Sequence, residues 1–346
     1  MVNSPLSSSS PNTVDAASQS QTNPPPSNPL GLTPPAEQDI VPIPLNGPLS
    51  LPESEVSGMA WYGDYLILLP QYPFRFAQPG KEGSIFALPK ADIIAFLDGR
   101  ITDPLDPIPI PFNSSGLTNL IFGSEGFEAI AFSGERAYLT IESHSGVPMM
   151  AFLTSARISP DLSQITLDKS TLVAIPPQTF LPNYSEEAVF IGGDKVISIY
   201  EVNGNSINSD PVAHRFDPVT HSLDTIPFPN IEYRITDATD LDATGRFWVI
   251  NTFTSKDAWL STDADSMTEK FGEGTSHAMF ETVERLIELQ YTQAGITLTD
   301  TPPIQLKLVD GEILRNWEAL ARLDERGLLI MTDKNPKSLL AFVPIP

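Results

Sequence analysis

Cysteine is absent from this chain of 346 residues, and histidine occurs only four times. Disulfides, thiolate catalysis, zinc knuckles and iron–sulfur clusters are therefore excluded, and so few histidines make a histidine-based metal site unfavoured. Basic residues are also scarce, with 20 Lys and Arg against 43 Asp and Glu, a formal net charge of −23. Nucleic acids and anionic membrane surfaces require a basic face, so neither is an expected partner, whereas a cation is compatible with this charge.

Long apolar runs are missing as well. No window of about 18 apolar residues occurs, so we expect no membrane span. Proline, by contrast, is abundant at 34 residues, roughly twice its usual share. Proline fits poorly inside helices but well at the edges and turns of short strands. With 41% hydrophobic residues, the chain predicts an all-β protein with a large core.

The first 36 residues differ from the rest. Residues 1–36 are rich in Ser, Pro, Asn and Gln and cannot bury enough apolar surface to fold, so they predict a disordered tail. They lack the basic start and apolar run of a signal peptide. The segment is either a tether that followed a removed export signal or a plain tail. We prefer the tether and expect an extracytoplasmic protein whose targeting segment is not visible.

Residues 37–346 predict a single domain with an internal repeat of about 65 residues. In each unit a small or acidic residue begins a short apolar strand, and a turn containing Gly or Asp leads to a second apolar strand. Gly and Asp tolerate the positive φ that tight hairpins require. The second strands are almost continuously apolar, which is typical of strands covered on both faces. The units begin at Ser57, Glu128, Glu187, Asp240 and Glu318.

Proline also marks the fourth strand of the first three units, at residues 107–111, 172–176 and 225–229, which predicts edge strands. The fifth unit lacks such a strand, but the same signature stands alone at residues 40–45. An N-terminal outer strand that completes the last unit closes a ring, so the sequence predicts a five-bladed β-propeller. An open solenoid would need no such closure. The long irregular insertion, residues 255–280, is a candidate lid.

The unit-initial positions would lie around one axis, because the first strand of each propeller blade lines the central channel. Converging carboxylates repel one another, and their pKa values rise unless a cation is present. Calcium takes six to eight oxygen ligands in flexible geometry, whereas magnesium prefers to keep its waters. The alternative is that each acid only accepts backbone N–H bonds. We predict an axial Ca²⁺ bound by Ser57, Glu128, Glu187, Asp240 and Glu318.

A second set of polar residues follows from hairpin geometry, because each second strand ends at the face where the first begins. These ends are Gln71, Glu142, Glu201, Asn251 and Asp333. The few nearby cations are Arg75, His144, Lys256 and Lys334. A metal, carboxylates and a few cations on one face suit a small anionic substrate such as a phosphate ester. The alternative is that they are ordinary solvated loop residues.

Three short segments carry a family resemblance. They are Phe-Glu-Ala-Ile-Ala at 127–131, Asp-Ala-Thr-Asp-Leu-Asp at 237–242, and Asn-Trp-Glu-Ala-Leu-Ala at 316–321, the last followed by Leu-Ile-Met-Thr-Asp-Lys. They resemble the esterase-like phytase family of bacterial β-propellers and, more distantly, the calcium-activated nucleotidases (apyrases). The resemblance implies an axial calcium at the five unit-initial positions and hydrolysis of a phosphate ester on that face.

Within this resemblance, the expected catalytic residues are Asp333 and Glu142 as acid or base and Lys334 as the phosphate contact. Basic residues are too few for a highly phosphorylated substrate such as phytate. A calcium-dependent hydrolase is the preferred function. The alternative is a non-catalytic exported propeller whose calcium is structural and which binds a ligand or protein. In either case we expect a monomer.

Overall fold

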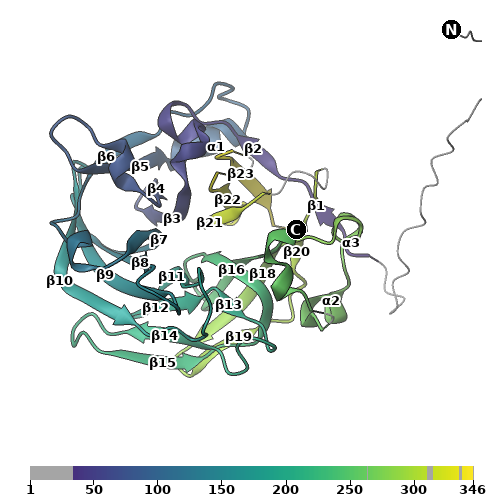
Figure 1. Ribbon diagram of the computed structural model, residues 1–346. Coiled ribbons are helices and arrows are strands. Elements are labelled where there is room, and N and C mark those ends of the chain that lie inside the picture. Colours follow the sequence, from purple (N-terminus) through teal and green to yellow (C-terminus); the bar gives the residue numbers. More distant parts are fainter. Residues whose placement is uncertain (1–33, 263, 310–314, 335–336, 346) are drawn as a thin grey trace, which may run out of the picture.

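The computed structural model describes residues 34–262, 264–309, 315–334 and 337–345 of the chain. Most of the regular structure is β, and the strands surround a common centre (Figure 1). The predicted tail lies outside the described residues except for its last three. Among the described helices, none is long and apolar enough to cross a membrane.

The strands pair into five antiparallel groups that follow one another along the chain. The first group contains β3 (Val56–Tyr62), β4 (Tyr65–Pro70), β5 (Gly83–Pro89) and β6 (Ile108–Asn113). The second contains β7 (Ser124–Ser133), β8 (Arg136–Ser143), β9 (Met150–Ile158) and β10 (Ile165–Ile175). The third contains β11 (Glu186–Gly192), β12 (Lys195–Tyr200), β14 (Val212–Phe216) and β15 (Leu223–Pro227).

The fourth group is less regular. Its main strands are β16 (Ile231–Ala238), β17 (Arg246–Phe253) and β18 (Val283–Thr292). Four short strands extend it, namely β13 (Val202–Asn203), β19 (Gly295–Leu298), β20 (Ile304–Leu306) and β1 (Glu37–Gln38). Residues 284–289 lie in β18, the third strand of this group.

The fifth group joins the two ends of the described chain. Strands β21 (Trp317–Leu323), β22 (Gly327–Thr332) and β23 (Leu340–Pro344) are completed by β2 (Val41–Ile43). Val41 pairs with Phe342, and Ile43 pairs with Leu340. The prediction that an N-terminal strand completes the last unit is therefore confirmed.

The inner strands of the five groups contact one another in turn. Strand β3 contacts β7, which contacts β11; β11 contacts β16, which contacts β21; and β21 returns to β3. The groups therefore stand around a centre in a propeller-like arrangement (Figure 1).

One apolar cluster fills the space between each pair of neighbouring groups. Strand β4 shows why its sequence is almost continuously apolar. Ile67 and Leu69 pack toward the second group, whereas Leu66 and Leu68 pack toward the fifth group. Successive side chains of a strand point to opposite faces, so a strand covered on both faces needs apolar residues throughout.

Strand β6 corrects one prediction. Its prolines, Pro109 and Pro111, were expected to mark a free edge. However, Phe112 and Asn113 pair in parallel with Ile165 and Thr166 of β10, so the first two groups form one eight-stranded sheet. The pairing is possible because it uses the residues after the prolines, whose own nitrogens carry no hydrogen.

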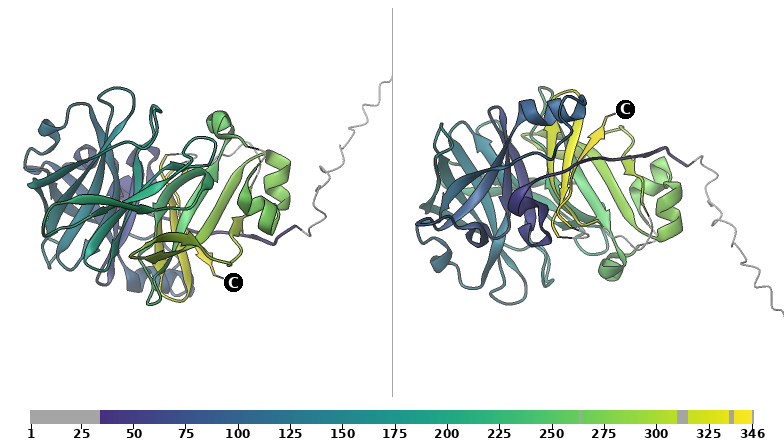
Figure 2. Two further views of the ribbon diagram at one scale, coloured as in Figure 1. Left: turned by 90° about the horizontal axis from the view of Figure 1, so that it is seen from below. Right: turned by 90° about the horizontal axis from the view of Figure 1, so that it is seen from above.

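Helices occupy the connections. They are α1 (Lys90–Leu97), α2 (Ser266–Phe271) and α3 (Thr275–Phe280), with 3₁₀ turns η1 (Gly47–Ser50), η2 (Pro52–Ser54), η3 (Pro73–Phe76), η4 (Thr118–Leu120) and η5 (Ser255–Leu260). The predicted lid contains η5, α2 and α3. Helices α2 and α3 lie at the outer edge of the molecule beside β1 and β20 (Figures 1 and 2). There the backbone N–H and hydroxyl of Ser276 donate to Glu37, both at 2.8 Å. These helices therefore do not form the lid that we expected.

Candidate functional site: a carboxylate-lined pocket

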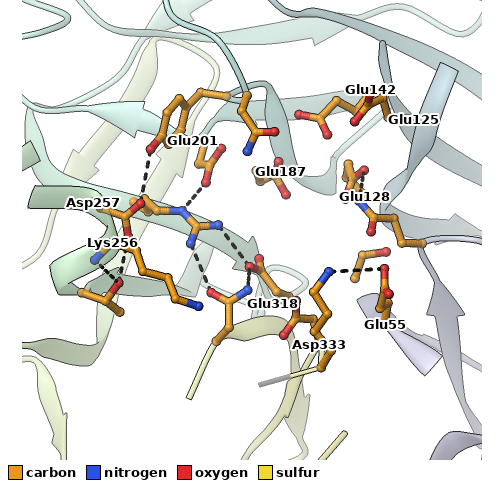
Figure 3. Close-up of a pocket in the computed structure, with 18 of the residues that line it drawn as sticks. Glu55, Glu125, Glu128, Glu142, Glu187, Glu201, Lys256, Asp257, Glu318 and Asp333 are labelled. Atoms are coloured by element: carbon orange, nitrogen blue, oxygen red, sulfur yellow. Dashed lines mark hydrogen bonds and ion pairs between the residues drawn. The ribbon is translucent and has the colours of Figure 1, made fainter. Parts of the chain in front are cut away.

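A pocket of about 400 Å³ opens where the inner strands begin (Figure 3). Its cationic lining residues are Arg234, Lys256 and Lys334. Nine carboxylates outnumber these three cations. The acids are Glu55, Glu125, Glu128, Glu142, Glu187, Glu201, Asp257, Glu318 and Asp333. The pocket is therefore the place where the acidic character of the chain is concentrated, and we call it the carboxylate pocket.

A register shift in the inner strand accompanies four of the predicted ring residues. The pairing of inner and second strand shifts at Ser57, Glu128, Glu187 and Glu318. Such a bulge inserts an extra residue and turns its side chain away from the regular ladder. All four of these residues line the pocket, so the structure brings them together.

Asp240 was wrongly aligned with these positions. It lies two residues beyond the end of β16, is exposed, and is not among the residues that line the pocket. The equivalent position is Thr236, within the register shift of β16. The Thr236 hydroxyl donates to the Trp317 carbonyl of the next group at 2.6 Å, just as Ser57 donates to the Phe127 carbonyl at 2.6 Å. The ring therefore contains three carboxylates and two hydroxyls.

The second predicted set is mostly at the pocket. Gln71, Glu142, Glu201 and Asp333 all line it. Asn251 does not, because it is fully buried and its amide donates to the carbonyls of Glu232 and Arg234. Lys256 and Lys334 line the pocket, whereas Arg75 pairs with Glu55 at 2.9 Å. The predicted catalytic residues Asp333, Glu142 and Lys334 are thus in one cavity.

Arg234 supplies a cation that the sequence analysis missed. Its guanidinium pairs with Glu201 of the third group and with Glu318 of the fifth group, the latter at 3.1 Å. It also donates to the Asn316 side chain at 3.2 Å. Burial alone would lower the pKa of Arg234, but these two carboxylates outweigh it and raise the pKa well above its usual range. Arg234 therefore bridges three groups of strands across the pocket.

Glu128, Glu142 and Glu187 have no cation partner among the described residues. Burial is the main cause that raises the pKa of Glu128 and Glu187 well above the usual range, and neighbouring carboxylates add to it. Burial raises the pKa of Glu142 to about 7. Gln71 donates to Glu128 at 3.0 Å. Glu187 is only 7% exposed and has no hydrogen-bond partner in the part of the chain that is described.

The rim of the pocket is more open to water. Lys334 is half exposed, and its Nζ lies 3.7 Å from Glu55. Lys256 is exposed and enters the pocket from the start of the 255–280 insertion, beside Asp257. His144 lies 3.8 Å from Glu125. The buried end of the pocket is thus mainly acidic, and the two lysines are at its mouth.

Comparisons with known proteins give a distant likeness. No protein-family model and no curated protein sequence matches this chain. An exo-β-1,3-galactanase from Phanerochaete chrysosporium aligns at a TM-score of 0.49 and 9% identity, covering 90% of this chain and 65% of that one. A putative glycoside hydrolase from Parabacteroides distasonis aligns at 0.44 and 11% identity, covering 93% and 95%. A glutaminyl cyclase from Myxococcus xanthus aligns at 0.41 and 10% identity, covering 90% and 100%.

Likenesses this weak do not transfer a function. Several of these neighbours are enzymes, but the predicted membership in the esterase-like phytase family stays a prediction. The function must be argued from the pocket itself.

The donor atoms of the pocket suit a calcium ion better than a transition metal. Carboxylate and hydroxyl oxygens line it, and among the described lining residues none offers sulfur or imidazole. The side chains are not prearranged, however. Within the described ranges, no three acidic or histidine side chains already surround a common point. Binding would require side chains such as Glu128 and Glu187 to turn toward each other.

Proposed function

We propose that this chain is a five-bladed β-propeller whose carboxylate pocket binds Ca²⁺ and hydrolyses a small anionic substrate such as a phosphate ester. The observation that carries the proposal is the Glu187 carboxylate. It is buried, faces the pocket beside Glu128 and Glu142, and lacks a hydrogen bond or cation among the described residues. An unpaired buried carboxylate is costly, so its presence favours a ligand that compensates it.

The cation would belong on the side of the pocket away from Arg234. Arg234 already pairs with Glu201 and Glu318, whereas Glu128, Glu142 and Glu187 have no cation partner among the described residues. The hydroxyl of Ser57, which lines the same pocket, offers a further oxygen. A bound Ca²⁺ would polarise a phosphoryl oxygen and offset the charge of the substrate.

The other residues have separate roles in this proposal. Glu142, whose pKa is raised to about 7, can accept or return a proton at neutral pH. Asp333 lines the pocket from the end of β22 and is the second acid–base candidate. Lys256 and Lys334 at the mouth would attract and orient an anion. Arg234 holds the third, fourth and fifth groups in a fixed relation around the reacting atoms.

Calcium titration tests the metal directly. We expect the melting temperature of the full chain to rise in millimolar calcium relative to EDTA, with little change in magnesium, because a ligand bound only by the folded state stabilises it. Glu187→Gln should abolish the rise. Glu135→Gln, an exposed glutamate in the β7–β8 turn, is the matched control and should behave as wild type. No calcium effect, together with a blank metal analysis of the purified protein, would refute the proposal.

Turnover distinguishes the hydrolase from the alternative, a binding protein with structural calcium. Phosphate release would be measured in calcium across a panel of phosphate monoesters and diesters. Asp333→Asn should then lower kcat/KM by at least about a hundredfold, the size expected for loss of an acid–base group. Lys334→Ala should lower it through loss of a contact to the anion, and both variants should show little change in melting temperature. Calcium stabilisation without turnover on any panel member would favour the binding protein.

A further inference from the structure

A second cavity of about 410 Å³ adjoins the carboxylate pocket. It lies between the β4–β5 connection, residues 71–82, and the β6–β7 connection, residues 114–123. Gln71, Tyr72 and Glu125 line both cavities. The two spaces are therefore neighbouring compartments at the same face of the protein, and we call the second one the side cavity.

The side cavity differs from the carboxylate pocket in its chemistry. Glu125, which it shares, is the single charged residue in its described lining, and its walls include Phe74 and Ile121. Phe74 is 38% exposed. Its ring packs against two buried rings, Phe112 at 5.9 Å and Phe127 at 6.4 Å between centroids. The exposed face of Phe74 is thus a supported apolar surface.

Gln71 separates the compartments and is held in place from several sides. Its backbone N–H donates to the Glu55 backbone carbonyl at 2.7 Å, and its own carbonyl accepts from the Phe127 backbone N–H at 3.0 Å. Its side-chain amide donates to Glu128 at 3.0 Å. It packs so closely on Gly126 that a Cβ there would lie 2.3 Å from the Gln71 Cγ. The boundary between the polar and apolar compartments is therefore fixed by these hydrogen bonds and by the packing of Gln71 on Gly126.

We propose that one substrate occupies both compartments, with an aromatic or comparably apolar group against Phe74 and Ile121 and its anionic group in the carboxylate pocket. This inference rests on the proposed function and specifies its substrate as an aryl-type ester. Gln71, Tyr72 and Glu125 line both cavities, so the two compartments adjoin closely enough for one molecule to reach both across the Gln71 side chain.

Binding of separate parts of such a molecule tests the inference. The probes are 4-methylumbelliferone as the aryl part, inorganic phosphate as the anionic part, and 4-methylumbelliferyl phosphate as the whole, each titrated against the full chain in millimolar calcium. Phe74→Ala removes the platform, and Thr118→Trp fills the cavity from another wall. Both variants should weaken binding of 4-methylumbelliferone and of the whole ester about tenfold, a 1.4 kcal/mol effect.

Phosphate and calcium binding should be unchanged in both variants. Val219→Trp, on an exposed turn between β14 and β15, is the control.

The outcomes separate this inference from the proposed function. Unchanged 4-methylumbelliferone affinity in both Phe74→Ala and Thr118→Trp would overturn the inference, even if calcium binding and turnover are observed. Equal affinity for phosphate and for the whole ester would also overturn it. If calcium binding and turnover fail while the aryl affinity still depends on Phe74 and Thr118, the proposed function is wrong and the side cavity remains as an aryl-binding site.

Discussion

Two buried carboxylates in this protein have similar exposure but opposite surroundings. Asp265 is 6% exposed, and both of its oxygens accept from Arg285, at 2.7 and 2.9 Å. Glu187 is 7% exposed and has no such partner. Burial raises the pKa of each carboxyl, but Arg285 outweighs burial and holds the pKa of Asp265 below its usual range. The pKa of Glu187 stays well above it.

The difference shows which buried charges support the fold. Asp265, the N-cap of α2, ties that helix to β18 through Arg285, so its charge is part of a closed network. Glu187 repels Glu128 and Glu142 and contributes nothing comparable. A residue that lowers stability is retained where the site needs it. The carboxylate pocket should therefore respond to mutation in the opposite sense from the Asp265 network.

The largest effect should come from breaking the closed network. Arg285→Met leaves Asp265 buried without its cation and should lower the free energy of unfolding by about 4 kcal/mol. Urea denaturation followed by tryptophan fluorescence measures this. Arg326→Met, which removes an exposed arginine paired with Asp98, is the control and should cost less than about 1 kcal/mol. A loss below 1 kcal/mol for Arg285→Met would contradict the comparison.

The next largest effect should come from Arg234, the cation inside the pocket. Arg234→Met removes the partner of Glu201 and Glu318 and should cost about 3 kcal/mol in EDTA at pH 8. Adding Glu318→Gln to this variant should recover part of the loss, because one unpaired carboxylate disappears. Chemical denaturation of the single and double variants gives the coupling. Strictly additive losses would argue against the Arg234–Glu318 pair.

The free energy of unfolding measured over a pH series should show the combined effect of the pocket acids. The pKa values of Glu142 and Glu201, about 7, lie above that of an unfolded glutamate, so the folded state binds protons more tightly. Their contribution to stability is complete below about pH 4.5 and is lost as the pH rises through 7. In EDTA each of these two groups should lower the free energy of unfolding by about 2 kcal/mol between pH 5 and pH 8. Saturating calcium should flatten this decline, whereas a stability that rises over this range would contradict it.

The smallest expected change has the opposite sign. Glu187→Gln should raise the free energy of unfolding by about 1 kcal/mol in EDTA at pH 8, because an unpaired charge is replaced by a neutral amide. Differential scanning calorimetry of the variant beside wild type measures this. Asp265→Asn is the matched comparison and should destabilise. Destabilisation of both variants to the same extent would remove the distinction between the two sites.

The sequence predicted the repeated hairpins and the closing strand because their signal is local. Apolar strands separated by Gly-containing turns, and the isolated 40–45 signature, need no knowledge of distant contacts. The ring position in the fourth group was missed because Asp240 resembles its counterparts in charge. In four of the five groups an apolar residue directly precedes the ring position, as in Ile235-Thr236 and Val56-Ser57, whereas Asp240 follows Thr239.

Arg234 and the side cavity could not be predicted in the same way. Arg234 is the one basic residue of β16, a strand that also contains Glu232 and Asp237, and its partners come from the third and fifth groups. The direction in which the Arg234 side chain points depends on where β16 departs from regular pairing with β17. Phe74 and Ile121 lie in connections whose paths are set by tertiary contacts. The positions of such functional residues depend on how loops and bulges pack against one another in the folded protein. The alternation of residues along a strand carries no information about that packing.

The pairing of β2 with β23 has a consequence for the order of folding during synthesis. Strand β2 leaves the ribosome before any of the inner strands, yet its partner β23 is made after all of them. Until then the edge of β2 has no partner, and the apolar layer between the fifth and first groups is incomplete. Domains with such distant contacts fold slowly. The nascent chain would therefore expose part of this apolar layer until β2 and β23 pair.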